Sequence, residues 1–303
     1  MRRQILNNRI KDFVMRPFRS LLFSPGIRPE MMEKAPRSGA DGLIFDLEDS
    51  VPNDRRQEAR GYVTEALKRE GNPPVFVRAN HPSTGEMEKD LEAVVSDGLF
   101  GIILPKVETP GDVKRMDMVL SDLEARAGLS PGRVVILPLL ESCRGLHFTY
   151  EIVTASPRVQ SMAFSSGEEG DFMVDIGGRW TPEGEVFLYP RSQLVCETRA
   201  AGIGVLLDGV FMNLVDDDAL LRECNLARNM GYTGKMAIHP KQVAAIHSVF
   251  TPSAEEIEYS RGLIEAFREA EASGKAAVQF RGMMVDYANL KRAEQLLALA
   301  DSF

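Results

Sequence analysis

Cysteine is scarce in this chain of 303 residues, and the few that occur lie far apart. Cys143, Cys196 and Cys224 form no Cys-x-x-Cys pair, which argues against a disulfide framework and against a thiolate metal site. Long apolar runs are also lacking, because no stretch reaches the length of a membrane span and no signal-peptide core is present. We therefore expect a cytoplasmic protein that has no membrane partner.

Positive charge is in deficit as well. The chain has 36 Lys and Arg against 44 Asp and Glu, a formal net charge of −8. This balance argues against a nucleic-acid partner and against an anionic membrane surface. It does not exclude an anionic small-molecule substrate, because the local placement of arginine decides that.

Short apolar runs that end in polar or turn residues recur along the chain, with helix-forming stretches such as 54–69, 111–127 and 216–230 between them. Eight strand–helix repeats in a chain of this length predict a (β/α)₈ TIM barrel. A doubly wound open sheet is the alternative, although no glycine-rich dinucleotide motif follows the first run. Pro105 and Pro138 are expected near strand ends. The eight runs are 20–26, 42–50, 74–80, 101–108, 134–142, 161–171, 205–211 and 235–240.

The two ends of the chain extend beyond such a barrel. We assign residues 1–250 to the barrel domain and residues 251–303 to a C-terminal helical extension that carries a lid. The basic start, residues 1–20, is predicted to be a strap on the outside of the domain, with a transit peptide as the alternative. The segment 278–290 follows a Gly/Ala linker and is apolar, so we expect it to form a lid, an oligomer arm, or both.

Carboxylates end two neighbouring apolar runs. The run 134–142 ends on Glu141, and the run that starts at residue 161 breaks into Glu168, Glu169 and Asp171. Acids at adjacent strand ends of an α/β fold form the oxygen-rich pocket that a hard divalent cation needs. The alternative is a set of solvated loop acids. Other polar residues follow the remaining runs, and a packed barrel does not need so many charged strand ends; they are Arg28, Asp46, Glu48, Asp49, Arg78, Lys106 and His239.

Several segments resemble the motifs of one family, in collinear order and across nearly the whole chain. Residues 19–51 resemble the opening motif of the citrate lyase beta-subunit family, within the HpcH/HpaI aldolase/citrate lyase superfamily. The segments FVRAN, IILPKVE, LLES, GKMAIHPKQV and VFTPSAEEIE continue the match, and GMMVD resembles the family's C-terminal lid motif. The resemblance implies a TIM barrel that assembles into a homotrimer or homohexamer.

For the metal, the resemblance implies Mg²⁺, or Mn²⁺, held by Glu141 and Asp171. The family writes the second metal motif as Gly-Ala-Glu-Asp, whereas this chain has Glu168-Glu169-Gly170-Asp171. Alignment of the downstream DIGG segment with the family's Asp-Leu-Gly selects Asp171 as the ligand. Glu169 is the substitute candidate.

For catalysis, the resemblance implies that Arg78 binds the substrate's carboxylate or thioester oxygen and that Asp286 is the acid/base of the lid, often acting from a neighbouring subunit. Glu48 is expected to hold Arg78 or the water molecules of the metal. Glu141 would also contact the substrate. Three further residues would line the pocket: Phe23, Ile238 and His239.

The implied reaction is a reversible Claisen cleavage of a 3-hydroxyacyl thioester. A coenzyme A thioester such as malyl-CoA or citramalyl-CoA would yield acetyl-CoA, or a similar thioester, and a 2-oxo acid. Two alternatives keep the same site: a citrate lyase beta subunit that acts on a carrier-protein thioester, and a malyl-CoA thioester hydrolase. A non-catalytic ligand-binding barrel is a further alternative, which the acids Glu141 and Asp171 disfavour.

Overall fold

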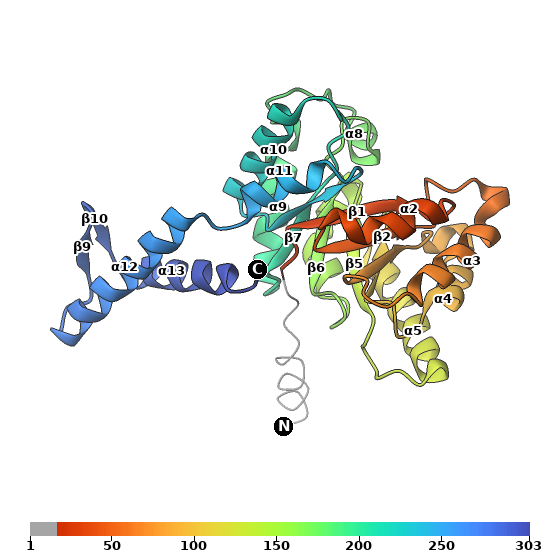
Figure 1. Cartoon of the computed structure of the whole chain (residues 1–303), viewed down its shortest axis with the longest axis horizontal. Helices are drawn as coiled ribbons and strands as arrows, with labels where there is room; N and C mark the ends of the chain where they lie inside the picture. Colours follow the sequence, from red (N-terminus) through yellow and green to blue (C-terminus); the bar gives the residue numbers. More distant parts are fainter. Residues whose placement is uncertain (1–16) are drawn as a thin grey trace. The chain divides into compact units, whose positions relative to one another are not determined.

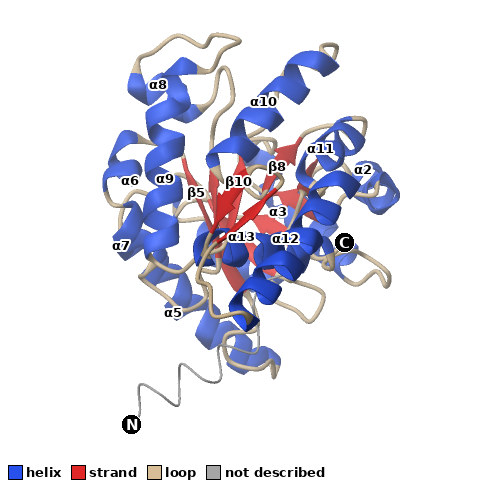
Figure 2. Ribbon diagram, turned by 90° about the vertical axis from the view of Figure 1, so that its left-hand side faces the viewer, coloured by secondary structure: helices blue, strands red, loops and turns tan. Residues whose placement is uncertain are grey.

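The computed structural model describes residues 17–303 and has a closed barrel of eight parallel strands, which confirms the predicted (β/α)₈ fold and excludes the open sheet. Each strand pairs with its sequence neighbours, and β1 pairs with β8 through Leu21 and Met236. The strands lie at the centre of a ring of helices (Figures 1 and 2). Their bounds are β1 Ser20–Pro25, β2 Gly42–Asp46, β3 Val75–Arg78, β4 Gly101–Leu104, β5 Val135–Leu140, β6 Ser161–Phe164, β7 Val205–Asp208 and β8 Gly234–Ala237.

The helices that cover the barrel begin and end close to the predicted positions. The three predicted stretches correspond to α3, α5 and α10. In α5, Thr109 and Asp112 form a capping box and Gly128 ends the helix in the left-handed conformation. The helices are α2 Pro29–Lys34, α3 Arg56–Leu67, α4 Met87–Val94, α5 Pro110–Ala127, α6 Cys143–His147, α7 Thr149–Val153, α8 Asp171–Ile176, α9 Leu188–Ala200, α10 Asp217–Met230 and α11 Gln242–Phe250. Within residues 17–303 no helix is long and apolar enough to cross a membrane. The predicted strap lies mostly outside the described residues.

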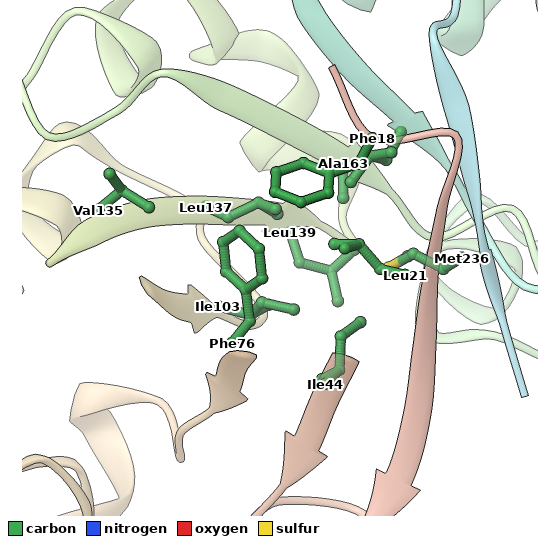
Figure 3. Packing of buried hydrophobic residues seen from close by; sticks show 11 residues of the cluster. Phe18, Leu21, Ile44, Phe76, Ile103, Val135, Leu137, Leu139, Ala163 and Met236 are labelled. Atoms are coloured by element: carbon green, nitrogen blue, oxygen red, sulfur yellow. The ribbon is translucent and has the colours of Figure 1, made fainter. Parts of the chain in front are cut away.

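The barrel interior is filled by large apolar side chains (Figure 3). Phe18, Phe76 and Phe100 pack edge to face near the N-terminal ends of the strands, with ring centroids 5.1–5.9 Å apart. Leu139 and Met236 belong to the same core cluster, nearer the other end. The barrel interior is therefore a packed core and not a pore.

Pro138 lies inside β5, so the expectation of a strand end is wrong for this residue, whereas Pro105 does directly follow β4. The reason is a local irregularity in the pairing of β5 with β6. An isolated bridge joins Ile136 to Val159, and the regular ladder resumes with Leu139 opposite Ala163, so that the register shifts by one residue in between. A proline is tolerated where the ladder is interrupted, because no hydrogen bond is lost there.

Residues from Val249 to Phe303 form a second compact unit. The helices α12 (Ala254–Ala272) and α13 (Tyr287–Ala300) pack around Leu263, Phe267 and Val285. Between them, β9 (Val278–Phe280) and β10 (Met283–Val285) form an antiparallel hairpin (Figure 1). Its two-residue turn, Arg281–Gly282, has positive φ at both positions, which is the geometry of a type I′ turn.

Candidate active site

Arg78 and Asp46 form a buried ion pair at the ends of two adjacent strands. The Arg78 Nε and Nη2 atoms donate to the two oxygens of Asp46, at 2.7 and 2.8 Å, and the side chain of Arg78 is only 12% exposed. The guanidinium also lies 5.0 Å from the ring centroid of Phe23 on β1. Burial raises the pKa of Asp46, but the charge and hydrogen bonds of Arg78 outweigh it and hold that pKa below its usual value.

This pairing modifies the predicted role of Arg78. One edge of the guanidinium is already bound by Asp46, so only the remaining N–H groups are available to a substrate. The Nη1 atom lies 3.1 Å from Glu48 Oε2 and 3.3 Å from Asp49 Oδ2. Asp46 therefore fixes the orientation of Arg78, a role that sequence reasoning missed, although Asp46 stood among the charged strand ends.

Lys106 joins acids from three parts of the barrel. Its Nζ lies 2.7 Å from Glu48 Oε1, 3.1 Å from Asp49 Oδ1 and 3.5 Å from Asp171 Oδ2. Its backbone N–H donates to Glu141 Oε1 at 3.1 Å. Burial lowers the pKa of the ammonium, but the hydrogen bond and charge of Glu48 outweigh that effect, so the pKa is raised and Lys106 is a cation. The sequence placed Lys106 only among the charged residues at the ends of the apolar runs.

Glu141 is almost completely buried at the end of β5, with 4% of its surface exposed. Burial raises its pKa to about 8, and the negative charges of Glu48 and Asp171 act in the same direction, against the charge of Arg78. Asp171 is half exposed, with 51% of its side chain accessible, at the first position of α8. Glu141 accepts from the backbone N–H of Lys106 and Asp171 lies 3.5 Å from its ammonium, so the same lysine contacts both predicted metal ligands.

Glu169 is exposed, as is its neighbour Glu168. Asp171 Oδ2 lies 3.5 Å from Lys106 Nζ, the ammonium that also contacts Glu48 and Asp49. The geometry therefore favours Asp171 over Glu169 as the second carboxylate of the site.

Glu48 is buried between the two cations of the site. Burial raises its pKa, and the charge of Arg78 and the hydrogen bond from Lys106 oppose that rise only in part. Its Oε1 accepts from Lys106, whereas Oε2 is buried without a hydrogen bond from any of residues 17–303, although Arg78 Nη1 lies 3.1 Å away. Glu48 thus contacts both Arg78 and Lys106, and the predicted contact with Arg78 is present.

Glu48, Asp49 and Lys106 line one pocket, of about 590 Å³. Arg78, Asp46 and Glu141 line another, of about 270 Å³, at the C-terminal end of the barrel. Phe23, Arg78, Glu141 and Ile238, all predicted site residues, line it together with Leu139, Met236, Asp46 and Ser165. His239 follows Ile238 but is exposed, and its Nδ1 accepts a hydrogen bond from the backbone of Lys241 instead of lining this pocket. Arg28 is also exposed and pairs with Glu30.

The donor set suits a hard cation that keeps part of its water shell. Among residues 17–303, no three His, Cys, Asp or Glu side chains are grouped so as to hold a metal by themselves. Glu141 and Asp171 offer two carboxylates, and burial disfavours the ionised form of Glu141, an effect that a divalent cation would offset. Mg²⁺ accepts one or two protein carboxylates and completes its octahedron with water and substrate oxygens, so these residues fit it.

A buried ion cluster supports the loop that carries Asp171. Asp208 at the end of β7 accepts from Arg191 on α9 and from Lys235 on β8, and Lys235 also pairs with Glu223. Asp208 and the backbone N–H of Gly209 both contact the Ser166 hydroxyl, at 3.0 and 3.1 Å. This anchors the start of the β6 loop, and sequence reasoning did not foresee it.

Asp286 caps α13 in the second unit. Its Oδ1 accepts from the backbone N–H of Ala288 at 2.9 Å and of Asn289 at 3.3 Å, and the Asn289 side chain accepts from the Asp286 N–H. Asp286 is exposed, as are Met283 and Met284 before it, whereas Val285 is buried. The capping role explains an acid here without catalysis, and the lid role remains a prediction.

Comparison with known proteins agrees with the motifs. The chain is 34% identical over 286 residues to the citrate lyase subunit beta of Leuconostoc mesenteroides, covering 94% of this chain and 93% of the relative. It is 33% identical over 304 residues to the L-malyl-CoA/beta-methylmalyl-CoA lyase of Rhodobacter capsulatus, covering 93% and 94%.

A solved structure is also similar. The protein CitE of Mycobacterium tuberculosis in complex with magnesium, acetoacetate and coenzyme A matches with a TM-score of 0.75 and 28% identity, covering 94% of this chain and 98% of that one. The HpcH/HpaI aldolase/citrate lyase family matches residues 19–240. With eight parallel strands, the acid pair at their ends and these relatives, the chain belongs to the HpcH/HpaI aldolase/citrate lyase family.

Proposed function

We propose that this protein is a Mg²⁺-dependent carbon–carbon lyase that cleaves, or forms, a 3-hydroxyacyl-CoA thioester such as malyl-CoA or citramalyl-CoA. The products would be acetyl-CoA, or a similar thioester, and a 2-oxo acid. The observation that carries this proposal is the convergence of Glu141 and Asp171 on Lys106, beside the fixed guanidinium of Arg78. The magnesium and coenzyme A of the similar solved structure, and the malyl-CoA lyase among the relatives, support it.

The pocket volume supports a small acid as the part of the substrate that is bound most deeply. A space of about 270 Å³ is small for a ligand pocket, so it would hold a 2-oxo acid while the coenzyme A arm extends outside. Glu141 and Asp171 would hold Mg²⁺, which supplies positive charge to the oxygens of that acid when it is bound. Phe23 and Ile238 give the pocket apolar walls.

Arg78 would stabilise the thioester oxygen, where negative charge develops as the carbon–carbon bond breaks. Because Asp46 and Phe23 fix the guanidinium before a substrate arrives, little reorganisation is needed at the moment of reaction. Glu48 would hold Arg78 and Lys106 in place. It would not act as a proton carrier, because its Oε1 is already engaged with the ammonium.

Asp286 would move the proton at the thioester's α-carbon, as the acid/base of a lid. The two exposed methionines before it, Met283 and Met284, give this segment an apolar surface suited to covering a pocket. We propose that a homotrimer or homohexamer brings the segment to a site, in the same subunit or in its neighbour. His239 would contact the substrate only outside the 270 Å³ pocket, on the exposed rim.

Two other functions use the same site. A carrier-protein thioester in place of coenzyme A would make the protein a citrate lyase beta subunit, the relative with 34% identity. Hydrolysis of the thioester would make it a malyl-CoA thioesterase. A coenzyme A thioester is the substrate under our proposal, whereas a citrate lyase beta subunit would need the carrier-protein thioester. Release of free coenzyme A would identify the thioesterase, because the lyase leaves the thioester bond intact.

The test is an assay of the purified protein with malyl-CoA and citramalyl-CoA, each with Mg²⁺ and with excess chelator. We expect a 2-oxo acid and an intact acyl-CoA as products, in the presence of Mg²⁺ only. Free coenzyme A together with malate would support the hydrolase instead. Turnover of a citryl carrier protein, with no turnover of either coenzyme A thioester, would support the beta-subunit function. Full activity in chelator would refute the metal assignment.

A further inference from the structure

Lys106 occupies an unusual backbone conformation at the end of β4. Its φ is +50°, and among residues 17–303 only Lys106 and Arg281 combine a side chain with positive φ. The left-handed region disfavours residues that have a Cβ, and glycine would fit there without strain. The conformation points the N–H of Lys106 at Glu141 Oε1. The chain therefore holds a lysine where the backbone alone would favour glycine.

The ammonium of Lys106 lies within 3.5 Å of three carboxylates. Glu48 and Asp49 are its closest partners, at 2.7 and 3.1 Å, and Asp171 lies at 3.5 Å. Through the backbone and the side chain, one residue thus contacts both proposed metal ligands. The side chain is 38% exposed, so the ammonium has room to shift between its partners.

The charges of the cluster do not balance. Four carboxyl groups contact the two cationic side chains, Arg78 and Lys106, and a fifth, Glu141, contacts the backbone N–H of Lys106. Arg78 is held by Asp46, so Lys106 is the cation that can move. The carboxyl groups are Asp46, Glu48, Asp49, Glu141 and Asp171.

We propose that Lys106 sets the metal affinity of this site: its ammonium competes with the divalent cation for Asp171, while its backbone N–H keeps Glu141 in position. This inference rests on the proposed function, because it takes Glu141 and Asp171 as the ligands. A metal ion on Asp171 and an ammonium on the same carboxylate repel each other. The ammonium must therefore withdraw towards Glu48 and Asp49 when the metal binds, and that step weakens binding and makes the metal exchangeable.

Two variants remove the ammonium and differ in their backbone strain. Lys106→Met keeps the length of the side chain and the strain at positive φ, whereas Lys106→Gly removes both. Lys68→Met is the matched control, because it also removes a lysine that is paired with an acid, Glu65. Lys68 lies on the surface at the C-terminal end of α3, and therefore at the other end of the barrel from the site. Circular dichroism checks that each variant is folded.

The experiment measures the affinity of the purified protein for Mn²⁺ by electron paramagnetic resonance and for Mg²⁺ by titration calorimetry, without substrate. We expect both Lys106 variants to bind either ion roughly tenfold more tightly than the wild type, since they remove one positive charge that lies 3.5 Å from the proposed ligand Asp171 at a partly screened position. Lys68→Met should bind within about twofold of the wild type.

The outcomes separate this inference from the proposed function. A wild-type protein that binds neither ion would overturn the metal assignment, and the role of Lys106 with it. A wild type that binds metal, with both Lys106 variants binding equally or more weakly, would leave the metal site in place and overturn the competition. In that case the role of Lys106 is structural: it holds the carboxylates in position, and its loss disorders them.

Discussion

Arg78→Lys separates the proposed catalytic role of Arg78 from its structural one. The substitution keeps the positive charge but removes the planar fork, so one of the two hydrogen bonds to Asp46 is lost together with the contact to Phe23. A hydrogen bond to a charged partner contributes about 1.5–3 kcal/mol, so we expect the free energy of unfolding to fall by about 2–3 kcal/mol. If Arg78 also stabilises the developing charge on the thioester oxygen, kcat should fall by about 100-fold.

Arg158→Lys is the matched control. Arg158 is also buried, with 5% of its side chain exposed against 12% for Arg78. It forms two hydrogen bonds to Glu124, both at 2.7 Å, and one to Asp117 at 2.6 Å. Its contacts lie on α5 and at the start of β5, towards the N-terminal ends of the strands and away from the pocket. This variant should lose a similar free energy of unfolding and keep its kcat at temperatures where it is folded.

The measurement pairs urea unfolding with the rate of 2-oxo acid release at saturating substrate. The reasoning about Arg78 is refuted if Arg78→Lys and Arg158→Lys lose the same stability and turn over at the same rate. Arg78 would then be only a structural partner of Asp46. A loss of kcat in Arg78→Lys alone, at equal stability loss, is the expected result.

Three further predictions concern the acids. Glu141→Gln and Asp171→Asn should each weaken Mn²⁺ binding at least about 100-fold, measured by calorimetry, while Glu169→Gln should leave it unchanged. If Glu169→Gln weakens Mn²⁺ binding and Asp171→Asn does not, Glu169 is the second ligand. Burial raises the pKa of Glu141 from 4.5 to about 8, so its ionised form is disfavoured in the folded protein. As the pH increases from about 4.5 to 8, the stability of the metal-free protein should therefore fall and its affinity for Mn²⁺ should rise. An affinity of the wild type that does not change with pH would contradict this. Asp286→Asn keeps a good helix cap, so the variant should retain its free energy of unfolding while its kcat falls at least about 100-fold. Mixing this variant with Arg78→Ala subunits should restore activity if the lid acts from a neighbouring subunit. An unchanged kcat would show that Asp286 is only a helix cap.

The barrel and its family were predictable from the sequence, because both depend on local patterns. Eight apolar runs at regular spacing indicate buried parallel strands, and the prediction is confirmed. Charged residues at the ends of those runs had to meet, because the carboxyl ends of parallel strands lie at the same end of a barrel. Glu141, Arg78 and Phe23 therefore meet as expected. The family and the lyase class inferred from the motifs are confirmed by the relatives.

What the sequence could not provide depends on pairings between distant residues. Nothing in the run 42–50 indicates that Asp46, and not Glu48 or Asp49, takes the guanidinium edge of Arg78. The positive φ of Lys106 has no signal in composition, since lysine rarely adopts it. Pro138 sits inside β5 because the pairing with β6 shifts by one residue, which an apolar run cannot reveal. The hairpin of the second unit was missed, although Arg281–Gly282 between the short segments VQF and MMV was a usable signal.

The floor of the 270 Å³ pocket belongs to the core that holds the barrel together. Leu139 and Met236 line the pocket, and each is also a member of the interior cluster, with 3% of its surface exposed. Making room for a bulkier acyl group by shortening Met236 would leave a void in the close-packed interior, at a cost of about 2–5 kcal/mol. A longer acyl group can be accommodated with a smaller loss of stability at the mouth, where Met31 and Val210 line the wall and are less buried. Changes of substrate range in this fold should therefore arise by substitution at the rim, while the depth of the pocket stays tied to the stability of the barrel.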